Sequence, residues 1–322
     1  MTIALLIAGF VLLVLGANFL VDGASSVARR LGVSDLVIGL TIVAFGTSAP
    51  ELLVGAVAAV QGTTDIAVGN VLGSNLFNIL AILGLAGVIR PLSIQQSTVW
   101  KEIPLGLLAA VLIAILGNDM FIDGQGRSVL SRGDGLVLLS FFVIFIYYVV
   151  GMAGKTRQDR SGESGRVFSM PVALGLLVLG SGMLALGAKW VVDSAVVLAT
   201  EMGVAQSVIG LTIVAAGTSL PELATSAVAS FKGKADVAVG NIVGSNIFNI
   251  FLILGVAATI HPLPMGAYAN FDIAAVVLAS LLLFVFAKLG FRYHQLERWE
   301  CAILLALYGT YLYILLAQNR PA

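Results

Sequence analysis

Ten stretches of predominantly apolar residues follow one another along the chain, separated by polar or glycine-containing connections. A helix needs about 20 mostly apolar residues to cross the hydrocarbon core of a bilayer. The pattern therefore predicts ten transmembrane helices, at residues 3–27, 36–60, 67–89, 99–117, 134–152, 170–198, 207–231, 238–260, 267–287 and 299–317.

Composition places most of this chain in lipid. Hydrophobic residues make up 59% of the sequence and charged residues only 11%, whereas soluble proteins carry about 25% charged residues. So few charges cannot cover the molecule with a solvated surface. The formal net charge is zero, so no bulk attraction to nucleic acid is expected. The only cysteine, Cys301, excludes an internal disulfide.

Lysine and arginine residues are concentrated in alternate connections. Thirteen lie in one set of connections and three in the other set, and Lys189 lies inside a helix, which accounts for all 17. Because cytoplasmic connections carry the excess of basic residues, the thirteen are expected in the cytoplasm. The count predicts both termini outside, in a multi-pass protein of the plasma membrane, which is the inner membrane of a bacterium.

The chain contains two copies of one unit. Residues 39–91 begin GLTIVAFGTSAPELL and residues 210–262 begin GLTIVAAGTSLPELA, with a constant offset of 171 and 33 identities in 53 positions. Five helices per unit is an odd number, so the second copy has to enter the membrane upside down. Inverted repeats with interrupted helices are typical of transporters, whose site lies at mid-membrane between the copies.

We therefore expect an all-α polytopic membrane protein with ten transmembrane helices in two inverted five-helix repeats. The first unit is predicted at residues 1–152, with its repeated segment at 36–91. The second is predicted at residues 170–322, with its repeated segment at 207–262. Residues 153–169 form a cytoplasmic linker that is too short for a folded domain, so no regulatory domain is expected.

Two glutamates, Glu51 and Glu222, lie at equivalent positions near the middle of the second and seventh predicted helices. A carboxylate at this depth costs roughly 2.5–3.5 kcal/mol on insertion scales. It is tolerated when it is protonated, paired with a basic side chain, or bound to a cation. No lysine or arginine lies within the second, third, seventh or eighth predicted helix, which favours a bound cation.

A proline precedes each glutamate, Pro50 in the first copy and Pro221 in the second. Proline lacks the N–H that bonds the carbonyl four residues back, and its ring strains that turn. We expect the helices to unwind here and to free carbonyl oxygens around Ala44 to Gly46 and Ala215 to Gly217. Carbonyl oxygens beside a carboxylate form a site for a hard cation, although a proline kink without such a site is the plainer alternative.

Hydroxyl and amide side chains accompany both glutamates. Thr47 and Ser48 lie four and three residues before the first glutamate and share its helix face, and Thr218 and Ser219 do the same in the second copy. The third and eighth helices contain GNVLGSNLFN and GNIVGSNIFN, in which a serine and an asparagine four residues apart share a face. These pairs are Ser74 with Asn78 and Ser245 with Asn249.

An asparagine amide near a helix centre supplies a neutral oxygen ligand. The alternative role for such serines and asparagines is hydrogen bonding between helices. We assign that packing role to the four remaining asparagines of these segments, which are Asn70, Asn75, Asn241 and Asn246.

These paired motifs resemble the cation/calcium exchanger superfamily, whose hallmark is a pair of inverted alpha repeats, and in particular its prokaryotic sodium/calcium branch. The resemblance covers nearly the whole chain. It implies an antiporter that exchanges Na+ for Ca2+ by alternating access, with no enzymatic activity and no cofactor. In that family the matching positions bind Na+ and Ca2+ by turns. The implied ligands are Glu51, Glu222, Thr47, Thr218, Ser48, Ser219, Ser74, Ser245, Asn78, Asn249 and the carbonyls of Ala44 and Ala215.

The chain departs from many members of that superfamily at two points. Many carry an aspartate at one of the positions held here by Asn78 and Asn249, so the fixed charge of this site is about −2. One Ca2+ or two Na+ would neutralise that charge, whereas three Na+, the usual count, would leave +1. Animal relatives carry large calcium-sensing domains in the central connection, and this chain has only the short linker. It is expected to function as a monomer.

Other functions remain open from the sequence. The same architecture serves exchangers driven by H+, in which the glutamates would titrate, and K+-dependent exchangers. The serine, threonine and asparagine side chains favour Na+ over H+. A membrane enzyme has little support, because the GTS segments have no histidine or other base to activate a serine. A purely structural membrane protein would not need two carboxylates at mid-membrane.

Overall fold

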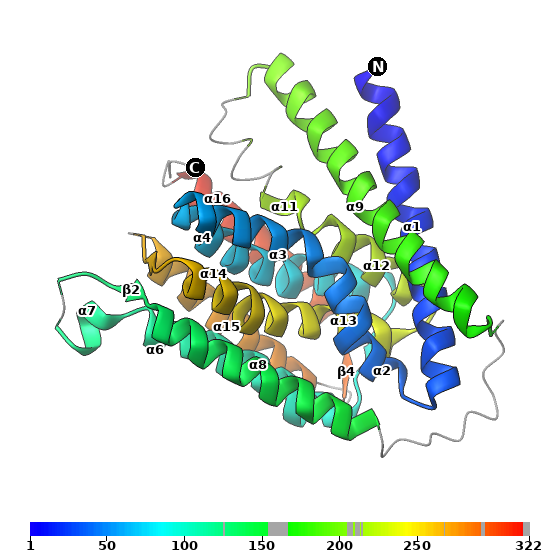
Figure 1. Cartoon of the computed structure of the whole chain (residues 1–322). Helices are drawn as coiled ribbons and strands as arrows, with labels where there is room; N and C mark the ends of the chain where they lie inside the picture. The colour runs from blue at the N-terminus through cyan, green and yellow to red at the C-terminus, as the bar shows by residue number, and fades with distance from the viewer. Residues whose placement is uncertain are drawn as a thin grey trace.

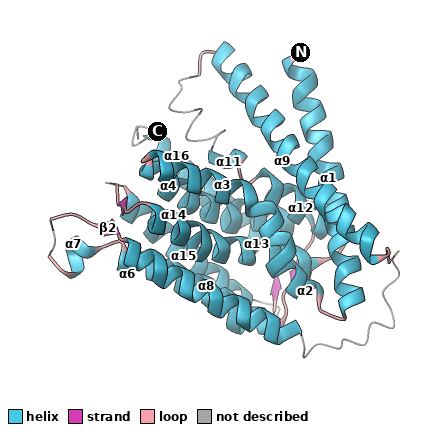
Figure 2. Cartoon of the chain, viewed as in Figure 1, coloured by secondary structure: helices cyan, strands magenta, loops and turns pink. Residues whose placement is uncertain are grey.

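Helices form nearly all of the described protein (Figure 2). The computed structural model describes residues 1–124, 126–153, 167–204, 209, 213, 215–266, 268–290 and 294–317. Within these residues, nine helical spans are long and apolar enough to cross a membrane, at Thr2–Leu31, Asp35–Gln61, Thr64–Ile89, Thr98–Leu116, Arg132–Ala153, Met170–Glu201, Ala235–Ile260, Ala269–Leu289 and Arg298–Ala317.

These spans confirm nine of the predicted helices, with ends shifted by a few residues. Of the remaining one, predicted at residues 207–231, the described part forms α11 (Ala215–Gly217) and α12 (Leu220–Phe231). Most of the predicted linker, residues 154–166, lies outside the described residues.

The first half of the chain contains three π-helical segments, labelled η, within its helices. In order, its elements are α1 (Thr2–Leu31), α2 (Asp35–Ile38), η1 (Gly39–Val43), α3 (Ala44–Gln61), α4 (Thr64–Leu76), η2 (Phe77–Ile82), α5 (Leu83–Ile89), β1 (Leu92–Ser93), η3 (Thr98–Glu102), α6 (Ile103–Leu116), α7 (Asp119–Ile122), β2 (Val129–Leu130) and α8 (Arg132–Ala153).

The second half repeats the pattern. Its described elements are α9 (Met170–Glu201), then α11 and α12, α13 (Ala235–Ile247), η5 (Phe248–Leu254), α14 (Gly255–Ile260), β3 (Leu263–Pro264), α15 (Ala269–Leu289), β4 (Gln295–Leu296) and α16 (Arg298–Ala317).

Helices α1 and α9 form a crossed pair at one edge of the molecule, beside a block made by the other long helices (Figure 1). Glycines let the two backbones approach closely. A Cβ atom added at Gly16 would lie 2.9 Å from the Gly180 carbonyl oxygen, and one added at Gly187 would lie 2.8 Å from the Gly9 carbonyl oxygen. Small residues at such crossings are typical of helix packing in membranes.

The centre of the block is formed by the two most buried spans, α4–η2–α5 and α13–η5–α14. Helix α3 packs against both α4 and α13, and α12 packs against α13. The π-helical segments η2 and η5 occupy equivalent places in the two halves, and each begins one residue before Asn78 or Asn249. Such wide turns within α-helices are frequent at functional sites.

Two short strand pairs join the halves. β1 pairs antiparallel with β4, and β2 pairs antiparallel with β3. Each pair therefore links the end of a central span in one half to the start of the last helix in the other half. The crossing connections hold the two inverted units in register, so that equivalent residues of α3, α4, α12 and α13 face one another.

Candidate ion-binding site

The two glutamates come together where α3, α12 and α13 meet. Glu51 lies inside α3 and Glu222 in the first turn of α12, and each residue is 1% exposed. Within the described part of the chain, no lysine or arginine forms an ion pair with either carboxylate. Two acidic groups thus share a closed region without a basic partner, as the sequence predicted.

Hydroxyl groups bind the carboxylates across the two halves. Ser48 donates to Glu222 Oε1 at 2.8 Å, and its counterpart Ser219 donates to Glu51 Oε1 at 3.3 Å. Ser48 Oγ also lies 2.9 Å from Ser245 Oγ, and Ser245 lies 3.4 Å from Glu222 Oε1. Ser48 and Ser219 therefore each contact the glutamate of the other half, and Ser245 contacts the glutamate of its own half.

The predicted unwinding before the glutamates is present in only one copy. In the second half α11 ends at Gly217, residues Thr218 and Ser219 form a turn, and α12 begins at Leu220 with Pro221 in its first turn. In the first half the prediction is wrong, because α3 continues from Ala44 through Pro50 to Gln61.

The two carbonyl oxygens predicted as ligands stand differently in the structure. Pro50 removes the backbone bond of the Gly46 carbonyl, whereas Thr47 Oγ1 donates to the Ala44 carbonyl oxygen at 3.3 Å. The Ala44 carbonyl is therefore not free. Ala215 begins α11, and its side chain lies outside what the structure describes.

The two threonines also reach across the halves. Thr47 Oγ1 lies 3.0 Å from Asn241 Oδ1, and Thr218 Oγ1 lies 3.2 Å from Asn70 Oδ1. Since Asn241 and Asn70 are 171 residues apart, the two bonds are equivalent under the internal symmetry. These contacts link the two threonines, which precede the glutamates in the sequence, to α13 and α4.

The central asparagines form a matching pair of cross-links. Asn78 Nδ2 donates to Asn246 Oδ1 at 3.0 Å, and Asn249 Nδ2 donates to Asn75 Oδ1 at 3.0 Å. With their nitrogen atoms used in this way, Asn78 and Asn249 retain their side-chain oxygens for another partner.

Several buried acceptor oxygens have no hydrogen-bond partner in the described structure. Buried polar atoms are nearly always satisfied in folded proteins. The unpartnered oxygens of this region are Glu51 Oε2, Glu222 Oε2, Asn78 Oδ1, Asn249 Oδ1 and Ser74 Oγ. Four of these five oxygens can only accept hydrogen bonds. The partner that they lack therefore has to be a hydrogen-bond donor or a cation.

The donor set suits a hard cation. It consists of two carboxylates and neutral amide and hydroxyl oxygens, and hard cations such as Ca2+ bind oxygen ligands in proteins. Within the described residues, no group of three or more histidine, cysteine, aspartate or glutamate side chains is placed to hold a metal ion. The soft and nitrogen ligands that Zn2+ or Cu2+ favour are therefore not clustered there.

The structure confirms that the four remaining asparagines form hydrogen bonds between helices, and it shows their partners. Asn70 and Asn241 bind the threonines, and Asn75 and Asn246 bind the central asparagines. The constant offset of 171 is the sequence signal for these contacts, because a contact between the halves at one position implies its counterpart.

Comparison with known proteins gives a consistent result. The sequence profile of the family described as sodium/calcium exchanger protein matches residues 1–151 and 172–317. The putative antiporter CaxA of Alkalimonas amylolytica is 40% identical over 320 residues, covering 96% of this chain and 97% of that protein. The sodium/calcium exchanger MaX1 of Methanosarcina acetivorans is 32% identical over 350 residues, covering 97% of each.

Among solved structures, the chain is similar to the sodium-calcium exchanger NCX_Mj in crystals soaked with Na+ and Ca2+. The TM-score is 0.82 at 34% identity, and the match covers 99% of this chain and 98% of that one. The similarity therefore extends through both halves and through the elements that carry the candidate site.

Proposed function

Because this chain belongs to the sodium/calcium exchanger protein family, whose members are cation/calcium antiporters and not enzymes, we propose that it exchanges Na+ for Ca2+ by alternating access. Glu51 and Glu222 are the charged ligands of this proposal. The hydroxyl and amide groups around them complete the coordination, and the lipid bilayer is the protein's solvent.

One observation carries the assignment of the site. Two buried carboxylates, from inverted copies of one motif, lie together, and among the described residues neither has a basic partner and each keeps one oxygen atom unpartnered. The side-chain oxygens of Asn78 and Asn249 are unpartnered in the same way. A cation between the halves would satisfy all four oxygens and would offset the cost of burying two negative charges.

Charge balance limits what the site can carry. The fixed charge of −2 from Glu51 and Glu222 is neutralised by one Ca2+ or by two Na+, since Asn78 and Asn249 are neutral. A charge left over in this low-dielectric region is costly. We therefore propose that the Ca2+-loaded site is neutral, and that a third Na+ would bind more weakly than the first two.

The neutral ligands favour Na+ as the counter-transported ion. Oxygens of Ser48, Ser219, Ser74, Asn78 and Asn249 can coordinate Na+ but take no part in carrying a proton. An H+/Ca2+ exchanger would need only the two carboxylates to change state. The neutral hydroxyl and amide groups around the two glutamates therefore support Na+ as the driving ion.

The proposal is tested with purified protein in sealed vesicles. Ca2+ uptake is measured into vesicles loaded with Na+, with K+ or at acid pH, each against the same outside solution. We expect Ca2+ uptake only into the vesicles that are loaded with Na+. Equal uptake into acid-loaded vesicles without Na+ would contradict the proposal and would favour proton exchange.

The glutamates are tested in the same assay. Glu51→Gln and Glu222→Gln each remove one charge with little change of shape, and each is expected to abolish Na+-driven Ca2+ uptake. Glu102→Gln is the matched control, because Glu102 is a fully buried carboxylate that bonds Tyr148 outside the site. Near-normal uptake by either site variant would overturn the assignment.

A further inference from the structure

The two central asparagines can serve as ligands only in one amide orientation. Asn78 has to direct Oδ1 toward the ion and Nδ2 away from it, because an N–H group repels a cation. That orientation is set by Asn246, whose Oδ1 accepts from Asn78 Nδ2 at 3.0 Å. Asn246 is therefore held correctly only if its own amide nitrogen faces away from Asn78.

The equivalent asparagine in the other half is oriented by the protein itself. Asn75 Oδ1 accepts from Asn249 Nδ2 at 3.0 Å, and Asn75 Nδ2 lies 3.4 Å from the backbone oxygen of Asn246. Both ends of the Asn75 amide therefore have partners. Turning that amide over would break both bonds at once.

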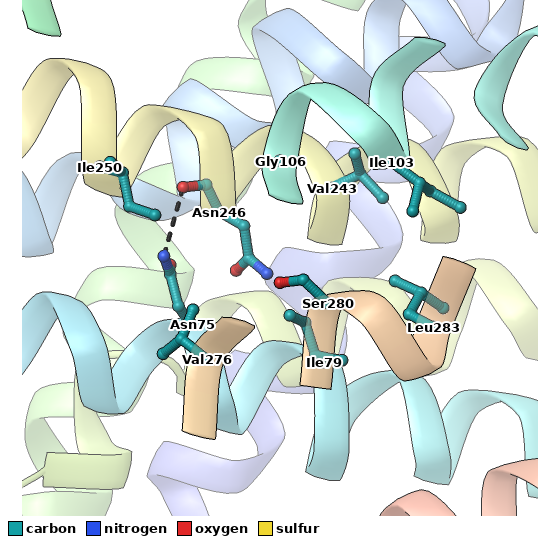
Figure 3. A pocket seen from close by; sticks show the side chains of 10 residues that line it. All are labelled: Asn75, Ile79, Ile103, Gly106, Val243, Asn246, Ile250, Val276, Ser280 and Leu283. Atoms are coloured by element: carbon teal, nitrogen blue, oxygen red, sulfur yellow. Dashed lines mark hydrogen bonds between the residues drawn. The ribbon is translucent and has the colours of Figure 1, made fainter. Parts of the chain in front are cut away.

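The nitrogen of Asn246 has no such partner among the described residues. It points instead toward the hydroxyl of Ser280 on α15, and both residues line a cavity of about 20 Å³ (Figure 3). The Ser280 side chain is buried, and its hydroxyl makes no hydrogen bond with another described residue. Two polar groups thus face the same small space without touching.

The lining of this cavity decides what it can hold. Apart from Asn75, Asn246 and Ser280, its lining is aliphatic and contains no charged side chain. The side-chain oxygens of both asparagines already accept hydrogen bonds from Asn249 and Asn78, so the cavity presents mainly an N–H donor and a hydroxyl. A cation would find no carboxylate here. A water molecule needs about 10–15 Å³ and two or more polar partners, and both are present.

We propose that one buried water molecule bridges Asn246 Nδ2 and Ser280 Oγ, and that Ser280 is a positioning residue for the ion site. The water accepts from Asn246 and donates to Ser280, which fixes the Asn246 amide and, through it, the Asn78 oxygen. This inference rests on the proposed function, because it assumes that Asn78 binds the transported ion.

The internal repeat shows that this arrangement belongs to one half only. Aligning α6 with α15 at an offset of 170 matches their buried positions, such as Ile103 with Ile273 and Ile113 with Leu283. Ser280 then corresponds to Ala110, which carries no hydroxyl. The first half lacks this serine, and there Asn75 is oriented by its bond to the backbone oxygen of Asn246. In the second half, Ser280 and the water orient Asn246 instead.

Two variants of Ser280 with side chains of equal shape separate the effect of the hydroxyl group from the effect of side-chain volume. Ser280→Val fills the cavity, expels the water and offers no acceptor. Ser280→Thr adds the same volume but keeps a hydroxyl beside Asn246. Outer-sphere partners of a metal site typically contribute 10–100-fold to metal affinity, so we expect Ser280→Val to raise the KM for Ca2+ about tenfold. Ser280→Thr should stay close to the parent.

The maximal exchange rate should change much less than KM in both variants, since the carboxylates are untouched. Ser140→Ala is the matched control, because Ser140 lies on α8 and its hydroxyl bonds only the Leu136 carbonyl of its own helix. A merely structural role for Ser280 would lower thermal stability in both variants and leave KM unchanged.

The outcomes separate this inference from the proposed function. If the parent protein does not exchange Ca2+, the proposed function fails. If the parent exchanges Ca2+ and the Val and Thr variants share one KM, the role of Ser280 fails alone. Should either variant not fold, a structure of the parent at a resolution that shows ordered water decides the matter. Water density between Asn246 and Ser280 supports the inference, and an empty cavity overturns it.

Discussion

The α1–α9 crossing offers a test in which packing can be separated from helix propensity. Gly180 of α9 lies against the backbone of α1, where an added Cβ atom would be 2.7 Å from Leu20 N and 2.8 Å from the Gly16 carbonyl oxygen. Both atoms belong to the backbone, so neither can move aside by a side-chain rotation. Gly180→Ala therefore forces the two helices apart.

The size of the effect follows from that geometry. Overpacking a well-fitted contact typically costs about 1–3 kcal/mol. Alanine also favours a helix over glycine by about 1 kcal/mol, which partly hides the cost. Gly182→Ala on the same helix provides the correction, because a Cβ atom there would have no neighbour within 4 Å. The difference between the two variants should then isolate the packing cost, about 1–3 kcal/mol in favour of Gly182→Ala.

Unfolding in detergent, followed by heat or by a denaturing detergent, measures that difference directly. We expect Gly182→Ala to unfold slightly later than the parent, because of the helix propensity of alanine, and Gly180→Ala to unfold earlier than Gly182→Ala. If the two alanine variants unfold together, the close crossing of α1 and α9 is not the contact that stabilises the protein. Exchange activity, measured in parallel, shows whether wider helix spacing also impairs transport.

Two further predictions concern the site and the topology. Ser48→Ala removes the 2.8 Å bond to Glu222, whereas Ser219→Ala removes a contact of 3.3 Å. A hydrogen bond to a charged group contributes about 1.5–3 kcal/mol, so Ser48→Ala should raise the KM for Ca2+ more, and the reverse order would contradict the geometry. Arg160→Cys with Cys301→Ser should be labelled by an impermeant thiol reagent in inside-out vesicles only. Labelling on intact cells would contradict a cytoplasmic linker.

The membrane helices were the most predictable part of the fold. A bilayer sets the length of each apolar stretch, so hydrophobicity alone located them closely. Residues 134–152 were predicted for the fifth helix, and α8 spans Arg132–Ala153. The inverted repeat followed from the sequence for a similar reason, because 33 identities at one offset require a shared structure, and an odd helix number fixes its inversion.

Partners across the halves were less predictable. Helical spacing placed Ser48 beside Glu51, yet its shortest bond is to Glu222. Helical spacing in the sequence predicts which residues share one face of a helix. It does not predict which other helix packs against that face. The partners of Asn75 and Asn246 were not predicted for the same reason. Ser280 was missed because it has no motif around it.

The backbone differs around the two prolines because their tertiary surroundings differ. The segments GTSAPEL and GTSLPEL differ at one position among seven, but α3 is unbroken at Pro50 and the second copy turns at Thr218 and Ser219. Local propensity cannot separate nearly identical segments, so the surroundings select the conformation of each. The free-energy gap between the two forms is then small enough for packing to decide it.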